Sequence, residues 1–411
     1  MGQVFVRQGQ VLTIEHGTVI FGDKRTRATL IIDKGGQLIA DGTRDEPIVF
    51  TSAQDPGVRD RGDWGGLVIL GRANVNQPNP AIEGITPEVF FGTTGSTQYD
   101  DESSGILRYV RVEFGGIELS PNNETNSITM GGVGRGTVME YNMVSFGGDD
   151  GFEWFGGTVN GKYFVSHAMW DDDFNCDYGW SGNVQFGLVV RYPGFADQST
   201  SNGIECDNGP NDTDVLPLTA GTFSNLTIIG PIQSGSTVGN SNYGHAVDLR
   251  RRVSASIFNS VFTGFPLGIR MNQPSVFENY SEGRGVIENN VLVGLNGSTF
   301  RSGSGVEVND VEAYFVVRNT YIEGPYSDEI HQNLGLNTEI FYGAKLVDQY
   351  PSTPSFTVTS GMLASGAQFS NAKFSEVHRS GFFDEVDFIG AFGAENWTEG
   401  WTEFDPVDKV Y

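Results

Sequence analysis

Hydrophobic side chains recur along this chain in short runs, which are separated by clusters of Gly, Asn and Asp. Such runs, rich in β-branched and aromatic residues, are typical of strands. No region is dominated by the long 3.6-residue apolar period that would indicate helices. Near the amino terminus the pattern predicts strands at Val11–Ile14, Leu30–Ile32, Leu38–Ala40 and Ile48–Thr51. The expected corners, where a positive φ is needed, are at Gly17, Gly36 and Gly42.

A motif with Asn at its first position and Gly at its sixth recurs inside these runs. It begins at Asn142, Asn225, Asn259, Asn289 and Asn319, and the last four copies begin 34, 30 and 30 residues apart. A fixed period of this length indicates a solenoid, in which each coil buries its apolar face against the next. Asn side chains at one position per coil can stack in a ladder of amide hydrogen bonds. Separate sandwich sheets, the alternative, would not keep Asn in phase.

We therefore expect an all-β fold, a single-stranded right-handed parallel β-helix with loop insertions and a carboxy-terminal cap. One domain should span residues 1–411. Its parts are amino-terminal coils in 1–72, central coils in 105–344, and the last coil and cap in 357–411. Loops should interrupt the coils at about 73–104, 192–203, 207–220 and 345–356. The cap contains Trp397 and Trp401 and is expected to cover the open edge of the last coil.

The charge of the chain is strongly negative. A formal charge of −26 arises from 51 acidic and 25 basic residues. Such a field repels nucleic acid and anionic membrane surfaces and attracts cations, although solubility alone also accounts for an acidic surplus. No apolar run approaches the roughly 18 residues of a membrane span. Met1-Gly2-Gln3 leads directly into strand-like sequence without a signal peptide, as in a mature chain, so the compartment has to be inferred from the fold.

Several segments resemble known proteins. The amino-terminal strands resemble the opening coils of bacterial pectate-lyase-like β-helices. Three further stretches are similar to a family of bacterial surface proteins usually described only as lipoproteins or secreted proteins. They are GDWGGLVILGRA (62–73), the block that begins FGGDDGFEWFGG at residue 146, and FIGAFGAENWTEGWTEFDP (388–406). The resemblance covers most of the chain. It implies a β-helix and an extracellular or outer-surface location, and it names no reaction.

A band of acidic residues extends from Asp149 to Asp207. Three consecutive coils align by their turns at 151–155, 173–177 and 203–207. Period-two alternation places these residues in the core: Phe152, Trp154, Phe174, Cys176, Ile204 and Cys206. It places these outside: Glu153, Phe155, Asn175, Asp177, Glu205 and Asp207. Equivalent carboxylates on neighbouring coils would be about 4.8 Å apart, so a proton, a cationic side chain or a metal must compensate their repulsion.

The acidic band is also a candidate Ca²⁺ site. Its acids at turns and strand ends are Asp149, Asp150, Asp171, Asp172, Asp173, Asp177 and Asp207. Ca²⁺ takes many oxygen ligands from irregular turns, although the spacing matches no EF-hand loop. The same acids could instead cap turns through Asx hydrogen bonds in water, and both interpretations stay open. No organic cofactor is expected.

The same band offers candidates for catalysis. Glycoside hydrolysis needs two carboxylates about 5–10 Å apart, and Glu153 and Glu205 form the leading pair. Asp177, His167 and Arg270 are further candidates, the last because β-helix lyases combine Ca²⁺-binding acids with an Arg or Lys base. A lone His in a strand is more often structural than catalytic.

Aromatic side chains cluster around the acids. Exposed rings beside carboxylates are typical of sugar-binding grooves, because the C–H faces of pyranoses stack on them. Trp154 has the phase of a core residue. Trp170, Tyr178 and Trp180 are at turns, so they are the candidates for substrate binding.

Cys176 and Cys206, the only cysteines, occupy the same core-facing position in this alignment. Their Cα atoms should be about 5 Å apart, within the range that disulfides span. Because parallel side chains in register hold Cβ atoms slightly too far apart for an ideal bridge, a disulfide and a pair of stacked thiols both stay open. An oxidising compartment favours the disulfide.

The leading functional hypothesis is a secreted or cell-surface β-helix that binds a polysaccharide or another extracellular polymer along this face, with Ca²⁺. A hydrolase or lyase that cleaves a polysaccharide on the same face is the alternative. A passive structural or adhesive surface protein is the third interpretation, and a smooth coil flank without a groove would favour it.

Overall fold

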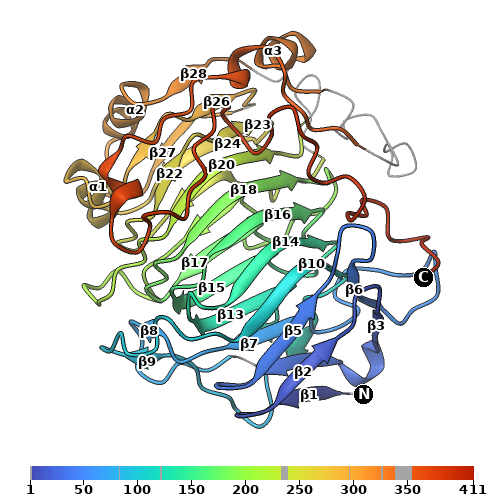
Figure 1. The fold of residues 1–411 in the computed structure, drawn as a ribbon. Coiled ribbons are helices and arrows are strands. Elements are labelled where there is room, and N and C mark those ends of the chain that lie inside the picture. Colours follow the sequence, from blue (N-terminus) through green and yellow to red (C-terminus); the bar gives the residue numbers. More distant parts are fainter. Residues whose placement is uncertain are drawn as a thin grey trace. The chain divides into compact units, whose positions relative to one another are not determined.

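The structure is a computed structural model that describes residues 2–82, 84–120, 123–232, 239–295, 297–324, 327–337 and 354–411. Stacked parallel strands form a right-handed parallel β-helix (Figure 1), as the strand pattern predicts. The chain divides into two compact units. The first unit comprises residues 1–182, 214–219 and 400–411, and the second comprises residues 183–213 and 220–399.

Two parallel sheets run through the first unit. One contains β1 (Gln3–Val6), β4 (Thr29–Ile32), β7 (Leu67–Leu70), β13 (Ile128–Val133), β15 (Phe152–Gly157) and β17 (Phe174–Asp177). The other contains β2 (Val11–Ile14), β5 (Gln37–Asp41), β10 (Gly105–Glu113), β14 (Val138–Ser145) and β16 (Gly161–His167), with β3 (Val19–Gly22) paired to β6 (Ile48–Ser52) and β6 to β10. All four strands predicted near the amino terminus are confirmed.

The core of the first unit is built of stacked side chains in register. Ile128, Phe152 and Phe174 are coil-equivalent and fully buried. Trp154 and Cys176 form the next buried level, as the alternation of the strands predicts. The alternate residues of these strands, among them Glu153, point away from this core. The alignment of these two coils is therefore confirmed.

The predicted corner glycines have two different roles. Gly17 adopts a φ of +71°, as expected. Gly36 and Gly42 do not have a positive φ, so the expectation is wrong for these two. They are needed for space instead, because a Cβ atom would lie 2.3 Å from the Val6 carbonyl oxygen and 2.7 Å from that of Tyr109, respectively. The loop at 73–104 carries two short parallel strands, β8 (Asn74–Val75) and β9 (Thr93–Thr94). A small antiparallel pair, β11 (Glu118–Ser120) and β12 (Asn123–Glu124), follows later.

The second unit continues the same pattern. One sheet contains β19 (Ile204–Cys206), β21 (His245–Leu249), β24 (Leu267–Met271) and β27 (Phe300–Ser302). The other contains β18 (Asn183–Val190), β20 (Thr222–Ile229), β23 (Val261–Thr263), β26 (Val291–Val293) and β28 (Thr320–Ile322), with β22 (Ser256–Phe258) paired to β20 and to β25 (Ile287–Glu288). The described part of this unit also contains the helices α1 (Pro274–Ser281), α2 (Val308–Val316) and α3 (Asp328–Leu334). Across the described residues, no helix is long and apolar enough to cross a membrane.

The asparagine motif forms a ladder in the second unit. Asn225, Asn259 and Asn289 are coil-equivalent, so three of the five predicted positions stack as expected. The Asn289 Nδ2 atom donates to Asn259 Oδ1 at 2.7 Å. Asn319 is offset by one position, because it aligns with Asn290. Asn142 belongs to the first unit, where it aligns with Val110 and Phe164.

The carboxy-terminal segment differs from the expected cap. In the second unit, backbone carbonyl groups at Phe388, Gln368 and Gly366 accept hydrogen bonds from the ladder residues Asn225, Asn259 and Asn289, respectively. In the first unit, Trp401 packs edge-on against Tyr109 and Tyr141. The segment thus follows successive coils along their flank, because their corner side chains offer hydrogen-bonding groups to its backbone. The loop expected at 345–356 lies mostly outside the described residues.

Candidate functional site

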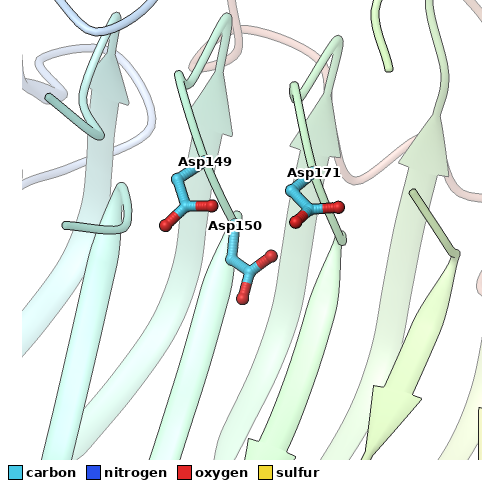
Figure 2. A group of neighbouring side chains, drawn as sticks. All are labelled: Asp149, Asp150 and Asp171. Atoms are coloured by element: carbon cyan, nitrogen blue, oxygen red, sulfur yellow. The ribbon is translucent and has the colours of Figure 1, made fainter. Parts of the chain in front are cut away.

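Three aspartates converge in the first unit. Asp149 and Asp150 are in the turn that joins β14 to β15, and Asp171 is one coil further, between β16 and β17. Backbone hydrogen bonds stack these turns, since the Gly151 amide donates to the Asp172 carbonyl at 2.8 Å. Each of the three carboxyl groups offers an oxygen within 4.8 Å of the other two (Figure 2). Three of the predicted metal ligands are therefore brought together.

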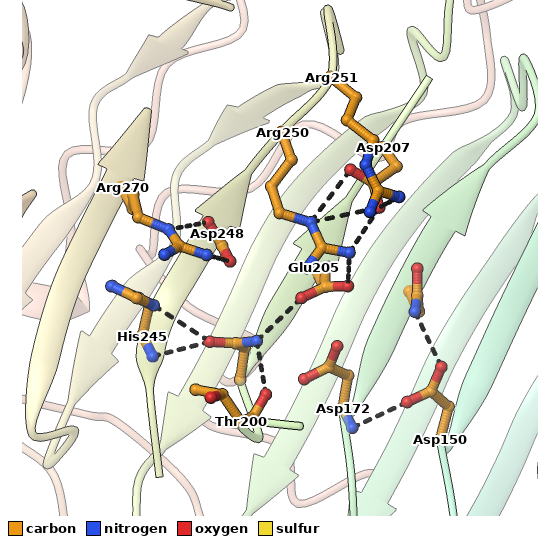
Figure 3. A network of polar contacts seen from close by, with 12 residues as sticks. Asp150, Asp172, Thr200, Glu205, Asp207, His245, Asp248, Arg250, Arg251 and Arg270 are labelled. Atoms are coloured by element: carbon orange, nitrogen blue, oxygen red, sulfur yellow. Dashed lines mark hydrogen bonds and ion pairs between the residues drawn. The ribbon is translucent and has the colours of Figure 1, made fainter. Parts of the chain in front are cut away.

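Burial and mutual repulsion disfavour the charged forms of this cluster. Asp150 is 5% exposed, and burial, followed by the charge of Asp171, raises its pKa to about 8. The Asp172 amide at 2.8 Å and the Asn175 side chain at 2.9 Å donate to its carboxylate and only partly oppose this shift (Figure 3). Burial and the neighbouring Asp150 also raise the pKa of Asp149 well above its usual value. A bound cation would remove the repulsion that protonation otherwise relieves.

The cluster borders a hollow of about 240 Å³, which we call the acidic hollow. Its lining combines carboxylates, amide and hydroxyl groups, and rings. The lining residues are Ala81, Ile82, Phe91, Glu124, Thr125, Asn126, Thr129, Asp149, Asp150, Glu153, Phe155 and Tyr178. Glu153, a predicted catalytic candidate, is thus placed beside Asp149 and Asp150.

Three aromatic rings form one wall of the acidic hollow. The Phe155 and Tyr178 ring centroids are 5.2 Å apart, and Phe91 stacks on Tyr178 at 6.5 Å. Phe91 is buried, whereas Phe155 and Tyr178 are half-buried and present part of their surface to the hollow. Tyr178, predicted to bind substrate, therefore lies beside the acids.

Asn126 connects this lining to Glu153. Its Nδ2 atom donates to the Glu153 carboxylate and, at 3.2 Å, to Thr129. Its Oδ1 atom is buried and has no hydrogen-bond partner within the described part of the chain. Asn126 itself is only 4% exposed. A buried carbonyl oxygen of this kind is costly unless a donor or a cation reaches it.

Sequence reasoning did not identify Phe91, Glu124 or Asn126. Asn126 had a usable signal, because it precedes β13 by the same two residues by which Asp150 precedes β15. Aligning one more coil would therefore have found it. Phe91 comes from the long 73–104 loop, whose packing no local pattern specifies.

The other predicted acids of the first unit have separate environments. Asp173 is fully buried and accepts a hydrogen bond from Ser166 at 2.6 Å. Asp177 accepts from the Tyr178 amide at 2.6 Å, in the manner of a turn cap. Asp172 is buried, and its backbone amide supports Asp150. None of these three lines the acidic hollow within the described residues.

The environments of Trp180, Trp170 and His167 differ from one another. Trp180 is fully buried, stacks on Trp154 at 4.9 Å and donates to the Val159 carbonyl, so the expectation of an exposed sugar platform is wrong. Trp170 is half-buried, and the Arg61 guanidinium lies 3.6 Å from its ring centroid. His167 is buried and hydrogen-bonds the Phe404 carbonyl at 3.1 Å, which is a structural role.

In the second unit the predicted acids are paired with arginines (Figure 3). Asp207 forms ion pairs with Arg250 at 2.6 Å and with Arg251 at 3.0 Å. Glu205 also forms an ion pair with Arg250, and Arg270 forms one with Asp248. Asp207 and Glu205 are thus already neutralised, which argues against roles as a Ca²⁺ ligand and a general acid.

Cys176 and Cys206 are both fully buried, as the alternation predicts. Each is disulfide-bonded in the structure. Buried cystines act on stability mainly by restricting the unfolded chain.

Comparison with known protein families identifies the family of this chain. Residues 1–323 match the family described as a pectate-lyase-like β-helix domain. No curated protein and no solved structure was found to match.

Proposed function

Because the chain belongs to the pectate-lyase-like β-helix family, we propose that it is a secreted or cell-surface protein that binds a polysaccharide or another extracellular polymer in the acidic hollow, with Ca²⁺. The family suggests a role connected with polysaccharides and an extracellular location. The observation that carries the proposal is the convergence of carboxylates and aromatic rings on one hollow.

The two chemical halves of the acidic hollow suit a sugar. Half-buried rings at Phe155 and Tyr178 offer apolar surface on which a pyranose can stack. Carboxylate and amide oxygens from Glu153, Asn126 and Glu124 offer acceptors for its hydroxyl groups. Ligand sites commonly combine an apolar wall with a few convergent polar groups in this way.

The oxygen atoms in the cluster suit Ca²⁺. Asp149, Asp150 and Asp171 offer one oxygen each within 4.8 Å, and the unpaired Asn126 Oδ1 belongs to the lining of the same hollow. Ca²⁺ accepts carboxylate and amide oxygens with flexible geometry. The ion would offset the repulsion between carboxylates and could also contact sugar hydroxyls.

Cleavage of the polymer is the second candidate function. It is favoured by the pKa of about 8 at Asp150, because a carboxyl group that is protonated at neutral pH can act as a general acid. Asp149 or Glu153 would then be the second carboxylate. Hydrolysis would be identified by the release of reducing ends from a bound polymer. The Asp150→Asn variant should lose this release and still bind the polymer.

Calcium binding is tested by its effect on thermal stability. Thermal unfolding of the intact chain with EDTA or millimolar Ca²⁺ should show stabilisation by the ion, about 2.7 kcal/mol at one hundred times its Kd. Asp171→Asn should remove that difference, whereas Asp55→Asn, an exposed site outside the hollow, should keep it. A melting temperature indifferent to both EDTA and Ca²⁺ would leave the acids as solvated turn residues.

Polymer binding is measured on a glycan array with the same proteins. Tyr178→Ala should lose the signal of any bound glycan, because it removes the stacking surface. Retention of full binding by this variant would exclude the acidic hollow as the site. Absence of binding to any glycan would favour the passive structural interpretation.

A further inference from the structure

One stretch of this acidic chain is rich in arginine. Between His245 and Ser302 there are six arginines, no lysine and four acidic residues, whereas the whole chain carries a formal charge of −26. The stretch supplies β21, β24 and β27 of the second unit. The outward-facing side chains of these strands form one charged surface of the second unit.

Three charged residues align across these strands. Asp248 pairs in register with Arg270, and Arg270 with Arg301. The flanking residues Ile269 and Met271 are buried, so the alternation directs Arg270 outward. Neighbouring strands of a sheet are about 4.8 Å apart. Two guanidinium groups therefore begin one strand spacing from each other on the same face.

The carboxylates of this surface do not balance its arginines. Arg250 and Arg251 are paired with Glu205 and Asp207, and Arg270 is held by both oxygens of Asp248 (Figure 3). Arg301 is exposed, and no ion pair or hydrogen bond engages its guanidinium among the residues that the structure describes. Four arginines thus face three carboxylates, and the excess positive charge is at Arg301.

His245 responds to the same positive charge. It is 3% exposed, and its Nε2 atom has no hydrogen-bond partner in the described part of the chain. Burial is the main cause that lowers its pKa to about 4; Asp248 opposes this shift, and Arg270, Arg301 and Arg250 contribute to it. The charges of Arg270 and Arg301 therefore both reach this buried side chain, together with that of Asp248.

We propose that Arg270 and Arg301 form a binding site for an oxyanion, a carboxylate or sulfate group carried by an acidic ligand. The planar guanidinium matches both groups through two parallel hydrogen bonds. An anion between the two side chains would compensate the unpaired charge of Arg301. The site uses no residue of the acidic hollow, so it stands or falls independently of the proposed function.

The test uses three dextrans of equal chain length: unmodified, carboxymethylated and sulfated. Binding to the intact protein is measured by calorimetry at one ionic strength. We expect no binding of unmodified dextran and binding of at least one charged form. Binding of carboxymethyl-dextran alone would identify a carboxylate as the ligand group, and binding of sulfated dextran alone would identify a sulfate. Binding of both would show that the site recognises the oxyanion chemistry that the two groups share.

Two variants localise the binding. Arg301→Gln should weaken it about tenfold or more, the scale of a lost charge-assisted contact, and Arg301→Lys should restore only part because an ammonium lacks the planar fork. Arg284→Gln is the matched control, since Arg284 lies in the same stretch but pairs with Glu282. Equal weakening by Arg301→Gln and Arg284→Gln, or no binding of either charged dextran, would overturn the proposal.

Discussion

The asparagines of the ladder combine two properties that few other side chains offer together. Asn225, Asn259 and Asn289 have φ values of +55°, +51° and +60°, in the left-handed region that Asn tolerates better than most residues. Their side-chain amides then bond the next coil and the backbone of the carboxy-terminal segment. Backbone conformation and hydrogen bonding therefore select the same residue type.

Removing one rung should be costly. Asn259→Ala leaves the Gln368 amide and carbonyl without these partners and removes one of the hydrogen bonds of the Asn289 side chain, so we expect a loss of about 1–3 kcal/mol in the free energy of unfolding. Denaturant unfolding measures it. Asn211→Ala, at an exposed loop position, is the control and should be nearly neutral. Equal effects of the two substitutions would contradict the ladder.

A buried histidine should make the protein sensitive to acid. Burial lowers the pKa of His331 to about 3 from an unfolded value near 6.5, while its Nε2 atom contacts Thr263 Oγ1 at 2.6 Å. Because the folded pKa is depressed, the stability is present above about pH 6.5 and is lost as pH falls towards 3. Each pKa unit of difference corresponds to about 1.4 kcal/mol.

The comparison that isolates this effect is His331→Gln, whose amide can keep a hydrogen bond to Thr263 but cannot be protonated in this range. The melting temperature of the wild type should fall more steeply between pH 6.5 and 4 than that of the variant. Parallel curves would show that His331 is not protonated on unfolding.

At the scale of elements, the strands were predictable and part of the site was not. Alternation of apolar and polar residues is local, so β2, β4, β5 and β6 and the core phase of Phe152 follow from the sequence alone. The acids at 149, 150 and 171 could be assigned to adjoining turns for the same reason. The aromatic wall depends on where Phe91 packs, and the pairing of Asp207 depends on Arg250 one coil away. Phe91 comes from a loop that no repeat relates to the coils, whereas Asp207 and Arg250 follow equivalent positions of two paired strands, so aligning one more coil would have suggested that ion pair.

Trp180 illustrates the limit of assigning exposure from a turn. A position after β17 suggested a free ring, yet the indole packs into the core beside Trp154, because its N–H group finds the Val159 carbonyl there. Tyr178, two residues earlier, has a φ of +52° and points its ring to Phe155. The backbone conformation of the turn decides which ring is buried and which lines the hollow, and amino-acid composition does not reveal that conformation.

The two cysteines belong to strands β17 and β19, and their oxidation can be measured directly. We expect no titratable thiol in the denatured, unreduced protein and two after reduction, because the structure has no free cysteine. Mass spectrometry after alkylation gives an independent count. Two reactive thiols before reduction would instead indicate stacked, unbridged side chains.

At the scale of the whole molecule, the two compact units are interleaved along the chain. The first unit receives residues 214–219 and 400–411 after the chain has already entered the second. Its contacts with the carboxy terminus include the Tyr411 hydroxyl, which lies 2.5 and 2.7 Å from the two carboxylate oxygens of Glu113. Cleavage of the chain at any single position therefore leaves residues of one unit on both fragments.

A single domain over residues 1–411 remains our prediction, and calorimetry tests it. The intact chain should unfold in one transition, with equal calorimetric and van't Hoff enthalpies. A fragment of residues 1–182 should be less stable than the same residues in the intact chain, because it lacks Trp401 and Tyr411. Two resolved transitions in the intact chain would show independent domains.

The carboxy-terminal segment also sets the order in which the second unit is completed during synthesis. Coils contact their neighbours and can form as they emerge, but the bonds from Asn225, Asn259 and Asn289 reach partners 163, 109 and 77 residues further along. Until those residues leave the ribosome, the ladder amides lack these backbone partners and are open to water or to other chains. The flank of the nascent second unit is therefore completed only when the carboxy-terminal segment arrives.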